Sequence, residues 1–325
     1  MSLIWTKLQK SLGVESYVAG STPGLQLDQE AIEGLQIVFR ATGANAPTLT
    51  QLLTSIERII VAVSGTDYVN ISGRSLYHLN EVMLGGEPPY TVVNSNTRHL
   101  CLFLPFSLGG SMHSPDTILD LRRTQSGLKQ AFVRFQLSFA GGEITAANSD
   151  VSVYQHYYTL GQHTRSIAAV RQLRERTFAG AKSQKTTIQL DHGSDFDDLA
   201  SLVIVGYTSA NALITTPLEA VTLTASENGT REIFSFADSV VMNLLPRQFQ
   251  GRPLAASNYD KSVFFYNFLR DDLKGQNRTL KGLLDGSAFS NLLLEVTPGA
   301  AGTYYVLLDR INTQQTEPGA ETAGG

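Results

Sequence analysis

Six histidines and one cysteine are the residues of this chain best suited to metal binding or nucleophilic catalysis. No two histidines have the His-x-His or His-x-x-x-His spacing that places two imidazoles on one metal ion. Cys101 lies in an apolar segment typical of a strand, where cysteine is normally a small hydrophobic residue. The sequence also lacks the short motifs of phosphate-binding loops, nucleophile elbows, dinucleotide-binding turns and zinc proteases. We therefore expect a protein without catalysis.

An acidic cluster beside a glycine is the strongest candidate for a metal site. Its four carboxylates belong to Asp191, Asp195, Asp197 and Asp198. Carboxylate oxygens near a turn suit Ca²⁺, although the spacing is not that of an EF-hand loop. The alternative interpretation is the start of a helix, capped by Ser194 or Asp195, with the last two aspartates at its positive end.

The N-terminal segment is a candidate contact surface. On a helix, its apolar side chains would share one face and its lysines would lie opposite: Ile4, Trp5, Leu8 and Leu12, against Lys7 and Lys10. Such a helix suits the surface of an anionic bilayer. It equally suits docking on the chain's own surface or on a neighbouring subunit. The segment lacks the apolar core of a signal peptide.

Composition limits the protein class further. The chain has 325 residues, of which 42% are hydrophobic and only 17% are charged. Polar uncharged residues and glycine make up the difference, which is typical of all-β proteins with many turns. The formal net charge of -4 argues against a nucleic-acid coat. The single cysteine excludes a disulfide framework and fits folding in a reducing cytoplasm.

The chain contains the same pattern twice. Residues 56–64 and 218–226 both alternate as strands, and both are followed by a turn and a second short strand. A helix-like stretch follows each pair, near residues 75–84 and 238–245. Residues 100–106 and 263–269 then match at an offset of 163, and residues 131–135 and 292–296 at 161. A final strand closes each half.

This arrangement predicts an all-β fold of two tandem eight-stranded jelly rolls with short helical excursions. We expect five regions: an amphipathic arm (1–24), a first jelly roll (25–164), a connecting segment (165–185), a second jelly roll (186–312) and a disordered tail (313–325). Helical spacing of Ile167, Val170 and Leu173 predicts a helix in the connecting segment. The surrounding arginines would form its solvated face or, in the alternative interpretation, a basic patch: Arg165, Arg171, Arg174 and Arg176.

The tandem units, each with a strand pair such as residues 59–63 and 69–73 followed by a helix, resemble the double jelly-roll major capsid proteins. These proteins form the shells of tailless icosahedral viruses with an internal membrane, such as corticovirus-like lipid-containing phages. The resemblance covers residues 25–312 and rests on strand order, length and composition. The compact loops, with no large insertion that would form a tower, depart from the family pattern and leave receptor binding open.

The resemblance implies a structural protein of the virion, made in the host cytoplasm. It implies a homotrimer of pseudo-hexameric outline that contacts neighbouring trimers and penton or minor capsid proteins. It also implies an N-terminus near internal membrane lipids, and Ca²⁺ binding as in some members. We expect no direct contact with nucleic acid. The alternative is a two-domain jelly-roll protein that binds or acts on carbohydrate.

Overall fold

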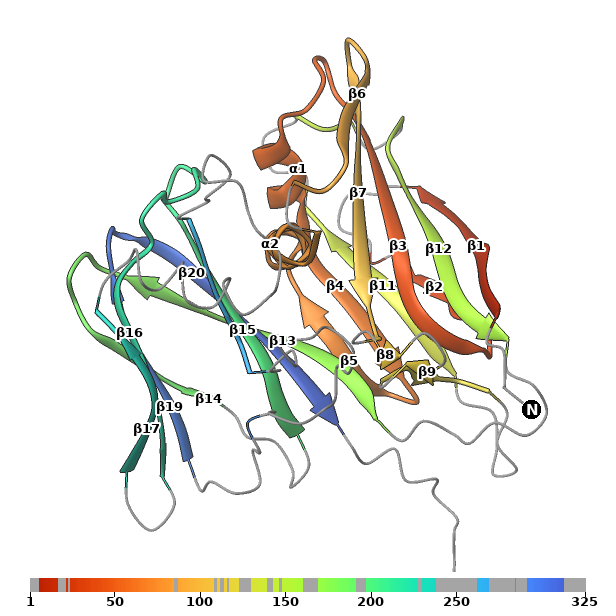
Figure 1. The fold of residues 1–325 in the computed structure, drawn as a ribbon. Helices are drawn as coiled ribbons and strands as arrows, with labels where there is room; N and C mark the ends of the chain where they lie inside the picture. Colours follow the sequence, from red (N-terminus) through yellow and green to blue (C-terminus); the bar gives the residue numbers. More distant parts are fainter. Residues whose placement is uncertain are drawn as a thin grey trace, which may run out of the picture. The chain divides into compact units, whose positions relative to one another are not determined.

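The computed structural model describes residues 6–16, 22, 24–84, 87–107, 110–111, 114–115, 117–122, 130–138, 143–145, 148–159, 169–190, 197–226, 230–237, 262–268, 284 and 291–312. These residues are mostly in β-strands (Figure 1). The chain divides into two compact units. The first comprises residues 1–70, 89–172 and 312–325, and the second comprises residues 71–88 and 173–311.

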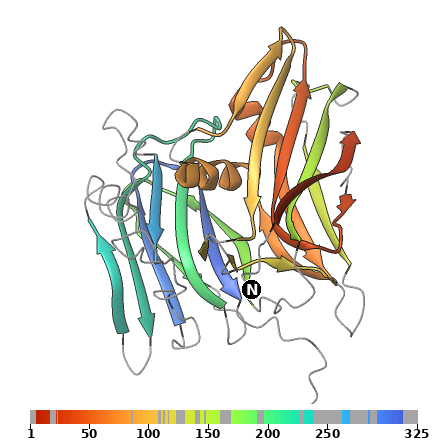
Figure 2. The ribbon, with the colours of Figure 1, turned by 45° about the vertical axis from the view of Figure 1, so that its right-hand side comes forward.

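Two main sheets make up the first unit. One consists, in spatial order, of β1 (Thr6–Ser16), β12 (Asp150–Thr159), β3 (Ala31–Thr42), β7 (Thr97–Pro105) and β6 (Tyr90–Asn94), with β10 (Leu119–Asp120) paired to β3. The other consists of β5 (Thr66–Ile71), β4 (Ile56–Val63), β11 (Ala131–Leu137) and β2 (Gly24–Gln26). The small pair β8 (Gly110–Ser111) and β9 (Ser114–Pro115) and the helix α1 (Leu49–Ser55) complete the unit. The strands of the first sheet lie side by side in Figures 1 and 2.

The second unit has the same construction. One sheet consists of β13 (Val170–Gly180), β20 (Gly302–Asn312), β15 (Asp197–Tyr207) and β18 (Val263–Asn267). The other consists of β14 (Thr186–Leu190), β19 (Asn291–Pro298), β16 (Leu218–Ser226) and β17 (Thr230–Phe236). The helix α2 (Gly73–Leu84) also belongs to this unit, although strands of the first unit precede and follow it in sequence.

The two units therefore repeat one topology. The order β1-β12-β3-β7 corresponds to β13-β20-β15-β18, and β5-β4-β11-β2 corresponds to β17-β16-β19-β14. The eight corresponding strands of each unit can be numbered from one to eight in chain order. Strands one, eight, three and six then form one sheet, and strands five, four, seven and two form the other. This is the strand order of a jelly roll. The predicted all-β fold of two eight-stranded jelly rolls is confirmed.

One predicted alignment of the repeat is out of register. The offset of 163 aligns Leu100 with Val263 in the repeat. In the structure, Leu102 pairs with Ile37 on the buried face of the first unit, and Phe264 pairs with Ile204 on the buried face of the second unit. Leu102 and Phe264 are therefore equivalent, and they are 162 residues apart. Because side chains alternate along a strand, an odd shift of one residue exchanges the two faces. The strands themselves are equivalent, and the correct offset is even.

Two predicted helices are wrong. Residues 6–16 form the strand β1, which pairs with β12 over its whole length, from Thr6 opposite Thr159 to Ser16 opposite Asp150. The segment thus has a strand partner, and the helical face of Leu8 and Leu12 does not exist. Residues 170–180 form β13, the first strand of the second jelly roll, instead of a connecting helix. The predicted helix near residues 75–84 is confirmed as α2.

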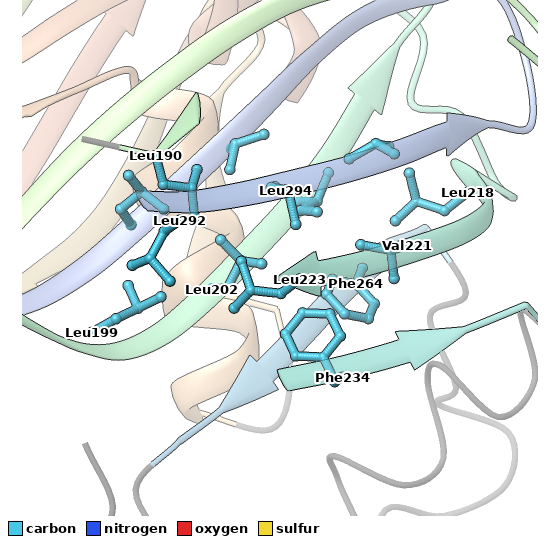
Figure 3. Close-up of a cluster of buried hydrophobic side chains, with 14 of the residues drawn as sticks. Leu190, Leu199, Leu202, Leu218, Val221, Leu223, Phe234, Phe264, Leu292 and Leu294 are labelled. Carbon is cyan, nitrogen blue, oxygen red and sulfur yellow. The ribbon is translucent and has the colours of Figure 1, made fainter. Parts of the chain in front are cut away.

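Each unit encloses an apolar core between its two sheets. In the first unit, Phe39 meets the ring of Phe135 edge to face at 5.8 Å between centroids. In the second unit, side chains from both sheets form one cluster, which includes Leu202, Leu223 and Leu294 (Figure 3). Burial of this apolar area is the main force that holds each pair of sheets together.

Tyr304 occupies a slot in the second core that two glycines create. It lies on β20, and the neighbouring strands carry Gly180 and Gly206 beside its ring. A Cβ atom at either glycine would approach a ring carbon to 2.7 Å, closer than Cβ atoms come to other atoms. The ring also stacks on Phe178, with 5.2 Å between centroids, and its hydroxyl donates to the carbonyl oxygen of Ala300 at 2.7 Å. Burial raises the pKa of this hydroxyl.

Candidate functional site

The predicted calcium site falls largely outside the described residues. Asp191 and Asp195 are among the residues that are not described, whereas Asp197 and Asp198 begin β15. The alternative interpretation, which places Asp197 and Asp198 in the first turn of a helix, is therefore wrong, because the strand β15 starts there. Within the described parts of the chain, no three His, Cys, Asp or Glu side chains are placed to share a metal ion. Calcium binding stays a prediction.

The N-terminal contact residues are only partly described. Ile4 and Trp5 lie outside the described residues, and Lys7 is described only in its backbone. Leu8 has a 40% exposed side chain, Leu12 is half-buried, and Lys10 forms an ion pair with Asp28 at 2.6 Å. The hydrogen bond from Lys10 to Asp28 raises the pKa of the lysine. The structure thus places apolar and charged side chains on one exposed edge strand. No helix in the described portion is long and apolar enough to cross a bilayer.

A buried polar cluster fixes α2 on the second unit. The guanidinium of Arg74, a residue only 6% exposed, donates to the Tyr305 hydroxyl at 2.8 Å and to Oδ1 of Asn211 at 2.7 Å. It also lies 4.3 Å from the centre of the Tyr207 ring, a cation–π distance. His78 is 2% exposed, and its Nε2 atom lies 2.7 Å from the Tyr207 hydroxyl.

The N-terminal end of α2 is tied down as well. The Ser72 backbone N–H and hydroxyl both donate to Oε2 of Glu175, at 2.9 and 2.6 Å. At the other end of the cluster, Nδ1 of His78 lies 2.8 Å from Oε2 of Glu81. Because these polar groups form hydrogen bonds with one another, the cluster fixes the position of α2 while the buried groups named here keep hydrogen-bond partners.

Contact with α2 distinguishes one sheet face of the second unit. On β15, Leu202 and Ile204 point into the core, so Val203, Val205 and Tyr207 point to the other, outer face. These three outward side chains are buried, and the two valines are each only 1% exposed. Tyr207 is the residue that α2 contacts through Arg74 and His78.

The equivalent face of the first unit is more exposed. We call it the first-unit outer face and define it by six half-buried side chains: Gln36 and Val38 on β3, Cys101 and Phe103 on β7, and Tyr154 and His156 on β12. None of the six carries a fixed charge. An ion pair between Arg40 and Asp150 lies at one end of the same strands.

Internal contacts hold the first-unit outer face in one arrangement. The Phe103 ring lies over Gly34, where a Cβ atom would be 2.4 Å from Cζ of the ring. The same ring meets His156 edge to face at 5.6 Å. Gln36 donates from Nε2 to the Cys101 sulfur at 3.1 Å, and its Oε1 lies 3.3 Å from Nε2 of His156.

A tyrosine near this face has a displaced pKa. The Tyr158 hydroxyl donates to Oε1 of Glu33 at 3.2 Å. Partial burial raises the pKa of Tyr158 to about 12, and the charge of Glu33 acts in the same direction. Both effects favour the neutral hydroxyl, so the group stays a hydrogen-bond donor over the physiological pH range.

Sequence reasoning missed both the polar cluster around α2 and the first-unit outer face. Arg74 and Tyr305 are 231 residues apart, and no local pattern relates them. The first-unit outer face could have been found, because Gln36, Val38 and Arg40 alternate with buried side chains along β3. What the sequence does not show is that the equivalent face of the other unit is buried.

Comparison with known proteins gives a clear result for the fold alone. No family model and no curated protein matches the sequence. Among solved structures, the MCP of STIV is similar with a TM-score of 0.69 and 11% identity, over 95% of this chain and 97% of that chain. The major capsid protein P2 of bacteriophage PM2 is similar with a TM-score of 0.60 and 11% identity, over 94% and 97%. The PBCV-1 virus capsid matches with a TM-score of 0.64 and 13% identity, over 95% of both chains.

The chain has the fold of these capsid proteins. The similarity covers both jelly rolls, since it extends over nearly the whole of each chain. The predicted resemblance to double jelly-roll major capsid proteins is thereby confirmed at the level of the fold.

Proposed function

We propose that this protein is the major capsid protein of an icosahedral virus and acts as a structural component of the virion. The observation that supports this most is the fold match over about 95% of the chain to capsid proteins. The buried polar groups described above serve to position α2, and the proposal includes no catalysis. The alternative of a carbohydrate-binding protein has less support, although aromatic side chains do share the first-unit outer face.

In this proposal the protein forms homotrimers of pseudo-hexameric outline. Three chains with two similar jelly rolls each give six similar sides, and such particles can tile a shell. The low fraction of charged residues, 17%, favours self-association because fewer charges must lose their hydration. Neighbouring trimers and penton or minor capsid proteins would be the further partners.

The first test is the mass of the purified protein in solution. We expect a particle of three chains, each of 35.3 kDa, by light scattering coupled to size exclusion. A protein that stays monomeric at high concentration would contradict the proposal.

We also propose that β1 faces internal membrane lipids or a neighbouring subunit. Leu8 and Val14 on this edge strand are 40% and 60% exposed. Burial of a large apolar side chain is worth roughly 1.5–3 kcal/mol, which is sufficient to contribute to docking.

Vesicle binding distinguishes membrane lipid from a neighbouring subunit as the partner of β1. If lipid is the occupant, the protein should co-sediment with anionic vesicles, and Leu8→Asp should lower the bound fraction severalfold because it places a charge in the apolar interface. Val93→Asp is the matched control, since Val93 is exposed at a different edge of the same sheet. Absence of binding by the unmodified protein would contradict the lipid contact and leave the subunit contact.

A further inference from the structure

The chain places α2 between two strands of the first unit. β5 ends at Ile71 and β6 begins at Tyr90, yet the segment between them, residues 71–88, belongs to the second unit. Ser72 alone separates β5 from α2. Because one residue of chain spans at most about 3.6 Å, the start of α2 and the end of β5 can move only together.

The first half of α2 is buried on all its faces. Residues 73–80 are all buried, and they span roughly two turns of helix. A surface helix would instead show one polar face to solvent. In α2 the polar side chains of Arg74 and His78 are buried together with the apolar side chains of Leu76 and Leu79. Release of this helix would therefore expose side chains from every face, which makes it costly.

Polar contacts attach the start of α2 to three strands of the second unit. Ser72 donates from its backbone N–H and its hydroxyl to Glu175 on β13. Arg74 donates to the Tyr305 hydroxyl on β20, and its guanidinium lies over the ring of Tyr207 on β15. β13, β20 and β15 are neighbours in one sheet. The anchors of α2 are therefore lost together when this sheet unfolds.

We propose that α2 is a strap that makes the two units unfold as one. While the second unit is folded, α2 is fixed and holds the end of β5 in place. When the second unit unfolds, α2 loses its anchors, and an isolated helix of 12 residues is at best marginal in water. β5 and β6 are then joined by a flexible loop, and closing that loop costs entropy. Such coupling is reciprocal, so the first unit stabilises the second to the same extent.

Pulsed hydrogen exchange with mass spectrometry along a urea gradient follows the unfolding of each unit separately. In the unmodified protein, peptides from β3 and β7 of the first unit should share one urea midpoint with peptides from β16 and β19 of the second. Arg74→Ala weakens the anchors of α2, so the peptides of the second unit should lose protection first. We expect the two midpoints to differ by on the order of 1 M urea.

Two further variants accompany this measurement. Arg231→Ala, at an exposed position on β17, is the control and should keep one midpoint. Tyr305→Phe removes only one acceptor of the Arg74 guanidinium, so it keeps the test possible if Arg74→Ala does not fold, and it should separate the midpoints less.

The comparison is made between variants of equal particle mass, so that a change in assembly does not contribute to the midpoints. Two midpoints in the unmodified protein would overturn the proposal. One midpoint that persists in both Arg74→Ala and Tyr305→Phe would also overturn it. Either result would leave the proposed capsid function standing, because that function does not depend on how the units unfold.

Discussion

Gly206→Val should destabilise the second unit by about 3 kcal/mol or more. The new Cβ atom would lie 2.7 Å from the Tyr304 ring and 3.1 Å from Cδ1 of Ile214, and neither can move without opening the core. Tyr304 is fully buried, so the displaced ring has no solvent to enter. The measurement is chemical denaturation followed by circular dichroism.

Two further variants make this result interpretable. Tyr304→Phe keeps the ring in its slot and removes only the hydrogen bond to Ala300, so it should cost about 1 kcal/mol. The double variant Gly206→Val with Tyr304→Leu should recover part of the loss, because the smaller side chain relieves the contact. An unchanged free energy of unfolding in Gly206→Val would show that the slot is not tightly filled.

Arg74→Ala should destabilise the second unit by roughly 3 kcal/mol, since it removes charge-assisted hydrogen bonds and a cation–π contact from a buried position. Arg74→Lys should recover little of this loss, because a lysine cannot donate to Tyr305 and Asn211 with the geometry of a guanidinium. Thermal denaturation followed by circular dichroism measures both effects.

An exposed arginine in the same unit is the matched control. Arg231 lies on β17 and is exposed, so Arg231→Ala should change stability by less than about 0.5 kcal/mol. If Arg74→Ala and Arg231→Ala have equal effects, the cluster around α2 contributes nothing particular to the fold.

Alternation made most of the strands predictable from the sequence. Val61 on β4 and Leu223 on β16 are fully buried, as the repeat at an offset of 162 predicts. Such strands have one face in the core and one outside it, so their period of two is visible.

The strands that the sequence missed lack this contrast. On β1 the described side chains are exposed or half-buried, so an apparent helical spacing of Leu8 and Leu12 competes with the strand. On β13 the four residues 170–173 are all buried, so both faces are covered and no alternation remains. Both are the first strand of their jelly roll, which explains why both predicted domain starts lie too late in the chain.

The candidate contact surfaces depend on distant parts of the chain. Three valines on outward sheet faces differ in exposure: Val203 and Val205 are buried, whereas Val38 is half-buried. The difference arises from the parts of the chain that pack on each sheet, since the residue type is the same. Local sequence therefore predicts the strand, while the tertiary structure decides which face stays available.

The particle mass over a range of protein concentrations tests the central claim most directly. If the proposed homotrimer is the building block of the shell, light scattering coupled to size exclusion should give three chains of 35.3 kDa at every concentration. A mass of one chain that persists at the highest concentration would contradict the account.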